Sequence, residues 1–261
     1  MTKGAGVDAE RFATWQRDRL EAKAGDSELL TFGPFQVALS KEKELPATSL
    51  VSLVDTGATE AETEKAIPKL KAAIKKHKST LEIAYNDAVF PKVGPWLEAG
   101  GLKLVRKDAL MAVRPEAFKP SVQPEVHLTQ LGPRAIAAEL EAFQQIRETN
   151  GGDANRPVPP IAILRAALEV PSSVYLLAWL DWEAAGTGVS HSLKGAAELA
   201  GIVTQKSLRR RGVAATVTSE LVRRHFDRGG DFVFLDSATE EAAKVYEGLG
   251  FTSFGTILVY R

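Results

Sequence analysis

The first half of the chain alternates short apolar runs with stretches in which apolar residues recur at helical spacing. The apolar runs predict strands at residues 35–41, 49–55, 79–85 and 104–113. The helical spacing predicts helices at residues 8–24, 59–77 and 90–101. Residues 59–77 begin acidic and end basic, which complements the helix dipole. The first half is therefore expected to mix helices and strands.

A proline-containing stretch, RPEAFKPSVQPE at 114–125, separates this half from a second alternating pattern. We interpret it as a linker that runs to about residue 124, so the expected domains are 1–124 and 125–261. The second half predicts strands at residues 126–131, 173–182, 187–195, 196–205, 231–237 and 251–261. It predicts helices at residues 133–148, 161–169, 213–227 and 239–250.

The two halves end in the same order of elements. Residues 79–114 and residues 230–261 each predict a strand, a helix closed by glycine and a second strand. The likeness is weak residue by residue, but the shared order suggests an internal repeat of one α/β unit.

Composition excludes several classes of function. The 261 residues carry 33 basic and 33 acidic side chains, without the basic excess of a typical nucleic-acid binder. There is no cysteine, which removes disulfides, thiolate metal sites and a cysteine nucleophile. The sequence has no signal-peptide pattern and no apolar run long enough to span a bilayer. We expect a soluble, cytoplasmic protein that binds neither nucleic acid nor membrane.

One basic segment, SLRRRGVAATVTSEL at 207–221, joins a predicted strand to a predicted helix. The first amides of a helix have no partners within the helix and attract anions, with help from the dipole. Gly212 lets the backbone approach a ligand closely, and Ala214 and Ala215 keep bulky side chains away. The segment therefore predicts a pyrophosphate site, although neither the NTPase phosphate loop nor the dinucleotide fingerprint is present.

The residues RRRGVA at 209–214 resemble the R/Q-x-x-G-x-G/A coenzyme A loop of the GNAT superfamily of N-acetyltransferases. Ala214 stands where glycine is common in that loop. The later segment TEEAAKVYEGLGF at 239–251 resembles the N-x-x-A-x-x-x-Y-x-x-x-G-F segment of the same family, with Thr239 in place of the common asparagine. The resemblance covers residues 125–261.

This resemblance implies the GNAT fold, a mixed and mostly antiparallel sheet flanked by helices, in the α/β (α+β) class. It implies acetyl-CoA as cosubstrate. No metal is expected, because His77, His127 and His225 make no metal-ligand pattern. The strand before the loop would pair with the pantetheine arm, and the loop amides would hold the pyrophosphate. The implied coenzyme-binding residues are Ile202, Val203, Thr204, Arg209, Arg210, Arg211, Gly212, Val213, Ala214 and Ala215.

The implied reaction is direct attack of a primary amine on the thioester in a ternary complex. Glu198 corresponds to the general base of several family members, and Tyr246 corresponds to the general acid that protonates the leaving sulfur. His191 alternates with Val189 and Leu193 along a strand and could face the cleft, but such a histidine is more often structural. The acceptor is expected to be a small-molecule or peptide amine, with loop 149–160 influencing specificity. The sequence leaves open whether the protein forms a homodimer.

The first half lacks both motifs. An acidic run, TGATEAETEKA, follows residues 49–55, and Leu97 takes the place of Tyr246 when Gly101 is aligned with Gly250. We expect residues 30–115 to be a smaller, degenerate and non-catalytic GNAT-like half that shapes the acceptor cleft. Two alternatives for the whole chain remain: a coenzyme A-binding regulatory or structural protein without catalysis, and, less favoured, nucleic-acid binding through the arginines.

Overall fold

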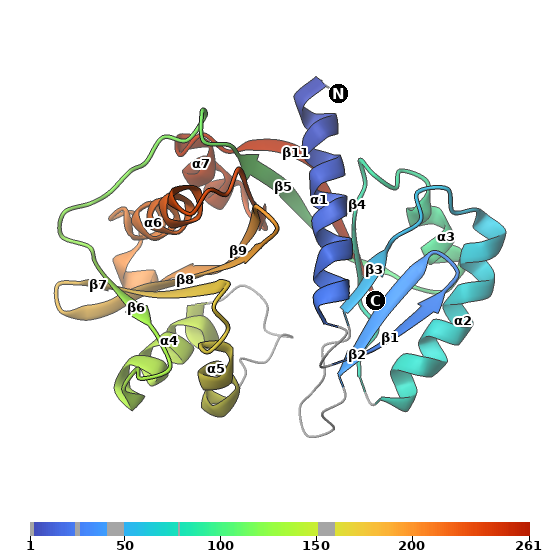
Figure 1. Cartoon of the computed structure of the whole chain (residues 1–261), viewed down its shortest axis with the longest axis horizontal. Coiled ribbons are helices and arrows are strands. Elements are labelled where there is room, and N and C mark those ends of the chain that lie inside the picture. Colours follow the sequence, from blue (N-terminus) through green and yellow to red (C-terminus); the bar gives the residue numbers. More distant parts are fainter. Residues whose placement is uncertain (1–2, 24–26, 41–49, 78, 151–159) are drawn as a thin grey trace. The chain divides into compact units, whose positions relative to one another are not determined.

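The computed structural model describes residues 3–23, 27–40, 50–77, 79–150 and 160–261 (Figure 1). The chain forms two compact units. One, the N-terminal unit, consists of Met1–Leu110 together with Ser253–Arg261, and the other, the C-terminal unit, consists of Met111–Thr252. The proposed division into domains at residue 124 stays a prediction. No helix in the described ranges has the length and apolar content needed to cross a membrane.

The N-terminal unit contains three helices and a three-stranded antiparallel sheet in the order β1-β2-β3, among the residues described. The sheet strands are β1 (Ser27–Phe32), β2 (Phe35–Ser40) and β3 (Leu50–Leu53). The helices are α1 (Lys3–Ala22), α2 (Glu60–Lys76) and α3 (Val93–Ala99). Strand β1 was not predicted from the sequence, and it is hydrogen-bonded along its whole length to β2.

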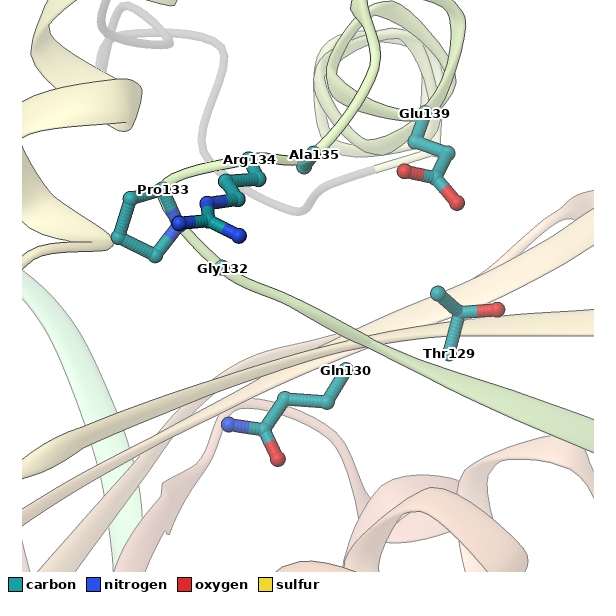
Figure 2. A pocket seen from close by; sticks show the side chains of 7 residues that line it. All are labelled: Thr129, Gln130, Gly132, Pro133, Arg134, Ala135 and Glu139. Atoms are coloured by element: carbon teal, nitrogen blue, oxygen red, sulfur yellow. The ribbon is translucent and has the colours of Figure 1, made fainter.

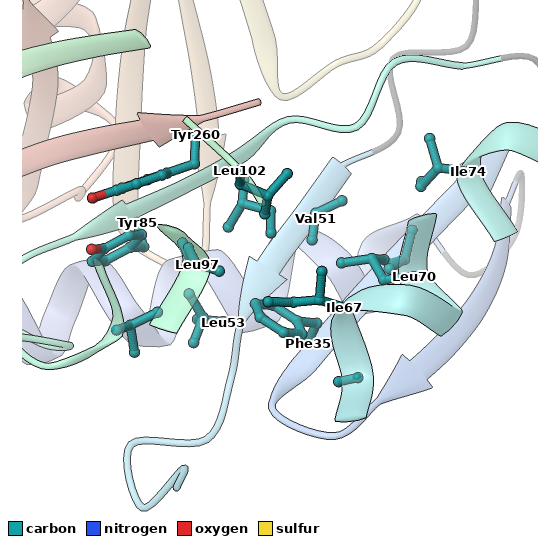
Figure 3. Packing of buried hydrophobic residues seen from close by; sticks show 14 of the residues in the cluster. Phe35, Val51, Leu53, Ile67, Leu70, Ile74, Tyr85, Leu97, Leu102 and Tyr260 are labelled. Atoms are coloured by element: carbon teal, nitrogen blue, oxygen red, sulfur yellow. The ribbon is translucent and has the colours of Figure 1, made fainter. Parts of the chain in front are cut away.

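Strand β2 and helix α2 form the centre of the N-terminal core (Figure 3). Alternate residues of β2, Phe35 and Val37 among them, point to one face, as the strand repeat requires. Ile67, Leu70 and Ile74 recur at helical spacing on the buried side of α2. Thr59 begins this helix with a capping box in which Glu62 accepts from the Thr59 amide at 3.0 Å.

The last strand of the chain belongs to the N-terminal unit. Strand β11 (Thr252–Tyr260) pairs antiparallel with β4 (Ile83–Asn86), with Tyr260 opposite Ile83. The strand order continues from β4 through β11 to β5 (Leu104–Val113). The Tyr260 ring stacks on the Tyr85 ring with centroids 6.1 Å apart. The N-terminal unit therefore includes the final strand of the chain, which pairs with β4.

The C-terminal unit contains a mostly antiparallel sheet in the order β10-β9-β8-β7-β6. The strands are β6 (His127–Leu131), β7 (Ser173–Leu180), β8 (Glu183–Leu193), β9 (Ala196–Thr204) and β10 (Phe232–Ser237). The helices are α4 (Ala137–Asn150), α5 (Ile161–Ala167), α6 (Val213–Asp227) and α7 (Glu240–Gly248), with a short 3₁₀ turn η1 (Lys206–Leu208). The predicted fold class is confirmed.

Helices cover both faces of this sheet (Figure 1). Helices α4 and α5 pack on the face that carries Tyr175, Leu177 and Val189. Helix α6 packs on the opposite face, where β8 has two glycines: a Cβ on Gly186 would lie 2.7 Å from Val213, and one on Gly188 would lie 2.4 Å from Val217. These glycines let α6 lie unusually close to the strands, so its N-terminus is fixed beside the end of β9.

Two of the differences from the sequence prediction have physical reasons that the structure shows. The predicted strand 173–182 ends at Leu180, because Asp181 and Trp182 have positive φ angles of 52° and 64° and form a two-residue hairpin turn. The segment predicted as a linker lies against α6: the Ser121 amide donates to Ser219 Oγ at 2.9 Å, and the Gln123 amide donates to Thr216 Oγ1 at 3.0 Å. Ser219 and Thr216 are buried, and these two bonds give their hydroxyl oxygens the hydrogen-bond partners that buried polar groups require.

Replacing Leu70 by Ala should lower the free energy of unfolding by about 2–5 kcal/mol, because Leu70 is fully buried and its removal leaves a cavity. Urea unfolding followed by circular dichroism measures this. The matched control, Lys69→Ala, changes an exposed residue of the same helix and should shift the free energy by less than about 0.5 kcal/mol. Equal effects of the two variants would contradict the assignment of Leu70 to the core.

Candidate active site

The centre of the candidate site is the place where β9 and β10 part. The two strands pair in parallel only from Phe232 opposite Ala196 to Phe234 opposite Glu198. Beyond Glu198, strand β9 continues to Thr204 while remaining paired with β8 on its other side. The last part of β9 therefore has one edge that no strand covers among the described residues. Such an edge presents backbone donors and acceptors to a ligand.

A β-bulge in β9 lies at this divergence. Thr187 of β8 is opposite Val203 and Val189 is opposite Ala200, so Gly201 and Ile202 together face the single residue Gly188. Gly201 has a φ of +58°, which only glycine adopts readily. Because a bulge bends its strand, it accounts for the departure of β9 from β10.

Backbone groups beyond the bulge alternate in direction. The Gln205 amide donates to the Ala185 carbonyl of β8 at 2.9 Å. Because backbone groups point alternately to the two sides of a strand, those of Val203 also point toward β8. Ile202 and Thr204 then present their backbone groups to the uncovered edge, and the Thr204 carbonyl accepts from Arg209 Nε at 3.4 Å. The Thr204 hydroxyl oxygen is buried without a hydrogen-bond partner in the described part of the chain.

The loop after β9 is shaped to expose amides. Arg210 and Gly212 have left-handed φ angles of 67° and 77°, and Gly212 is the N-cap of α6. Within the described residues, no hydrogen bond satisfies the amides of residues 210–215, whereas the Thr216 amide already donates to the Gly212 carbonyl. Successive free amides at a helix N-terminus form an anion site. Val213 is buried, and Ala214 and Ala215 are half-buried.

The three arginine side chains differ in their surroundings. All three are exposed, but Arg211 Nη1 forms an ion pair with Asp181 Oδ2 of the β7–β8 turn at 2.6 Å. Arg209 is bonded to the Thr204 carbonyl. Exposed pairs of this kind contribute little to stability, and the three charges lie close in sequence to the free amides.

Gln123 is a neighbour of this loop that the sequence did not reveal. A Cβ on Gly212 would lie 2.2 Å from Gln123 Cγ, so the Gln123 side chain packs directly against the glycine. Its position follows from the bond between its amide and Thr216. Proline content marks this segment as a linker, and nothing local in the sequence signals that it lies along α6.

Glu198 lies on the α4 face of the sheet, half-buried, directly opposite His191 of β8. His191 is in turn opposite Ser173 of β7, and its Nδ1 lies 2.9 Å from Ser173 Oγ. The His191 ring also makes an edge contact with Tyr175, with centroids 6.1 Å apart. Side chains opposite one another share a face, so Glu198, His191 and Ser173 form a polar row where β9 leaves β10.

Tyr246 lies on α7 and is buried against Phe251, with ring centroids 5.9 Å apart. Burial is the main cause that raises the pKa of its phenol, and the charge of Asp236 raises the pKa further. Asp236 lies on β10 two residues beyond Phe234, on the part of that strand that has left β9. The raised pKa keeps the phenol protonated at neutral pH, the state that a general acid requires.

A separate surface hollow of about 460 Å³ lies between β6 and the start of α4 (Figure 2). It is lined by Thr129, Gln130, Gly132, Pro133, Arg134, Ala135 and Glu139. Two of its polar side chains have local partners: Thr129 Oγ1 accepts from Trp179 Nε1 at 3.1 Å, and Glu139 accepts from the Ile136 amide at 3.1 Å. None of the sequence-predicted site residues lines this hollow.

Two further sequence expectations concern what surrounds the site. The described residues contain no group of three or more histidine, cysteine, aspartate or glutamate side chains that could hold a metal ion. Most of the loop expected to influence specificity, 149–160, lies outside the described residues.

Comparison with known proteins agrees with this geometry. A family model described as the acetyltransferase (GNAT) family matches residues 140–251. A GCN5-related N-acetyltransferase from Kribbella flavida has a TM-score of 0.75 at 21% identity, covering 95% of this chain and 94% of that chain. Another GCN5-related N-acetyltransferase, from Sphaerobacter thermophilus, has a TM-score of 0.65 at 15% identity, covering 87% of this chain and 76% of that chain.

A tandem GNAT protein from the clavulanic acid biosynthesis pathway has a TM-score of 0.59 at 12% identity, with 87% of this chain and 78% of that chain covered. No curated protein matches the chain. The structural matches extend over both halves of the chain, whereas the family model matches only the second. Residues 140–251 therefore match the acetyltransferase (GNAT) family model, and the structural matches show a GNAT-like fold over both halves of the chain.

Proposed function

We propose that the chain is an N-acetyltransferase that uses acetyl-CoA to acetylate a primary amine by direct attack in a ternary complex. One observation carries the proposal: an uncovered strand edge leads directly into a row of free amides at the N-terminus of α6. Coenzyme A has the matching sequence of groups, an arm containing amides followed by a pyrophosphate. The match of residues 140–251 to the acetyltransferase family model supports acyl transfer as the general activity.

In this proposal the coenzyme lies along β9 and the loop. Ile202 and Thr204 pair with the amides of the arm, and Val203 supports them from the β8 side. The pyrophosphate lies on the amides of Arg210, Arg211, Gly212, Val213, Ala214 and Ala215. The positive field of Arg209, Arg210 and Arg211 strengthens the attraction, with Lys206 nearby.

Glu198 and Tyr246 divide the proton transfers. Acetyl-CoA supplies an acetyl thioester, whose carbon–sulfur bond breaks as the carbon–nitrogen bond of the new amide forms. Glu198 takes the proton that the attacking amine loses, directly or through water. Tyr246, whose phenol burial keeps protonated, gives its proton to the leaving sulfur. Because the amine attacks the thioester directly, the reaction needs no covalent enzyme intermediate.

Two other functions are less well supported. The match to an acetyltransferase family does not favour a coenzyme A-binding protein without catalysis. Nucleic-acid binding through the arginines has no support from the net charge of zero. We propose that residues 1–124 and 125–261 act as separate domains, with only the second carrying the chemistry.

Release of free thiol tests the activity. The full chain, mixed with acetyl-CoA and a panel of primary amines, should release coenzyme A thiol only when a suitable amine is present. Calorimetry with coenzyme A separates the alternatives: binding without turnover across a broad amine panel would favour the non-catalytic protein, and absence of both would reject the proposal.

Substituting Gly212 by Glu should abolish coenzyme A binding, because a carboxylate would lie beside the amides proposed to hold the pyrophosphate. Isothermal titration calorimetry measures the dissociation constant. Gly212→Ala is the matched control, since its Cβ meets the same Gln123 side chain and the same positive φ without adding charge. Binding that survives in Gly212→Glu as well as in Gly212→Ala would rule out the loop as the pyrophosphate site.

Replacing Tyr246 by Phe should lower kcat by about 10- to 10⁴-fold and leave coenzyme A affinity nearly unchanged, because only the donated proton is lost. The Phe ring preserves the packing against Phe251. Steady-state thiol release gives kcat, and calorimetry gives the affinity. An unchanged kcat in a variant that still binds coenzyme A would remove Tyr246 from the mechanism.

A further inference from the structure

The guanidinium of Arg147 lies against the bulge of β9. A Cβ on Gly201 would lie 3.2 Å from Arg147 Cζ and 3.3 Å from its Nε and Nη2. Gly201 therefore does two things at once: its positive φ permits the bulge, and its missing side chain leaves room for the cation. The Gly201 carbonyl also accepts from Thr187 Oγ1 at 2.9 Å, which fixes this part of β9.

Helix α4 holds this cation in place. The Arg147 guanidinium lies over the ring of buried Phe143, 5.6 Å from its centroid, an attractive cation–π arrangement. One turn later, Asn150 Oδ1 accepts from the Lys206 amide at 3.0 Å, which ties the end of α4 to the start of the coenzyme loop. The position of the charge is thus set before any ligand arrives, which lowers the cost of ordering it on binding.

A small hollow of about 60 Å³ adjoins this guanidinium between α4, α5 and the sheet. Most of its lining is apolar, and Arg147, Gln144 and Tyr175 supply the polar groups. Burial raises the pKa of Tyr175, and the positive charge of Arg147 opposes that rise, so the field of the guanidinium extends into the hollow. The space suits one small anionic group flanked by apolar surface.

Arg147 and Glu198 lie on the same face of the sheet. Glu198 is opposite His191, which alternates with Val189 in the core beneath α4. Gly201 follows Glu198 by three residues, a separation of about 10 Å along an extended strand. A ligand anion at Arg147 would therefore leave an amine, a few bonds away, within reach of Glu198.

We propose that Arg147 binds a carboxylate of the acceptor, so that the acceptor is an amine that also carries a carboxylate a few bonds from its nitrogen. The inference rests on the proposed acetyl transfer and names its substrate class. The fixed cation attracts such a compound and repels polycationic amines, which bring only further positive charge to the same hollow.

The proposed carboxylate site can be tested with pairs of acceptors that differ in the charge of one group. The proteinogenic amino acids and their primary carboxamides should be compared as acceptors, with kcat/KM taken from thiol release. The wild type should prefer the carboxylate by about 10- to 100-fold, the ratio expected for hydrogen bonds to a charged group. Arg147→Gln should remove this preference through KM, and Arg147→Lys should restore part of it. Arg134→Gln, which removes an exposed arginine outside the hollow, should leave the preference unchanged.

Binding provides a second measurement that does not depend on turnover. N-acetylated amino acids and their carboxamides should be titrated by calorimetry into the protein saturated with coenzyme A. Tighter binding of the carboxylates than of the carboxamides, if it is lost in Arg147→Gln, supports the proposal. This holds even when no amine is acetylated, a result that would reject only the proposed activity. Equal binding of both compounds, or an equal loss for both in Arg147→Gln, overturns it.

Discussion

The bulge at Gly201 is the constraint on which the candidate site depends. Two residues of β9 face Gly188 alone, and this extra residue bends β9 away from β10 just after the pairing of Glu198 with Phe234. A regular strand would remain paired with β10 and would leave no free edge. The same bend carries the end of β9 to the loop before α6 and opens the space that the Arg147 guanidinium fills. The free edge of β9, the course of the chain to the loop before α6 and the position of Arg147, to which we assign coenzyme and acceptor binding, thus follow from one local irregularity.

The close approach of α6 to the sheet is the second requirement. Gly186 and Gly188 accept the side chains of Val213 and Val217 where any larger residue would hold the helix away. On its other side, α6 is held by the strap at residues 121–123 through two buried hydroxyls. Since the helix is fixed from both sides, its free N-terminal amides keep one position, and an anion bound there needs little reorganisation.

The sequence allowed the order of elements and the arginine–glycine loop to be predicted because both depend on local patterns. Strand β1 escaped detection because Leu29 and Leu30 are adjacent and break the alternation, so only pairing with β2 defines it. The bulge depends on the register between β8 and β9, which no single segment encodes. The same holds for Arg147, which is distant in sequence from the glycine it covers. It holds also for the strap, because the prolines on either side of it, Pro120 and Pro124, are typical of a linker.

The final strand offers a structural reason for keeping an N-terminal half without the coenzyme motif. Strand β11 follows α7, the helix that carries Tyr246, yet it pairs with β4 and stacks Tyr260 on Tyr85. A chain without residues 1–110 would lose β4 and most of β5, the two strands that flank β11, and would leave backbone groups of β11 unpaired. Because α7 is joined to β11 through Gly250 and Phe251, a frayed strand would also loosen the residue that packs on Tyr246. The first half thus supports the second by completing its last strand, whether or not it ever contacts an acceptor.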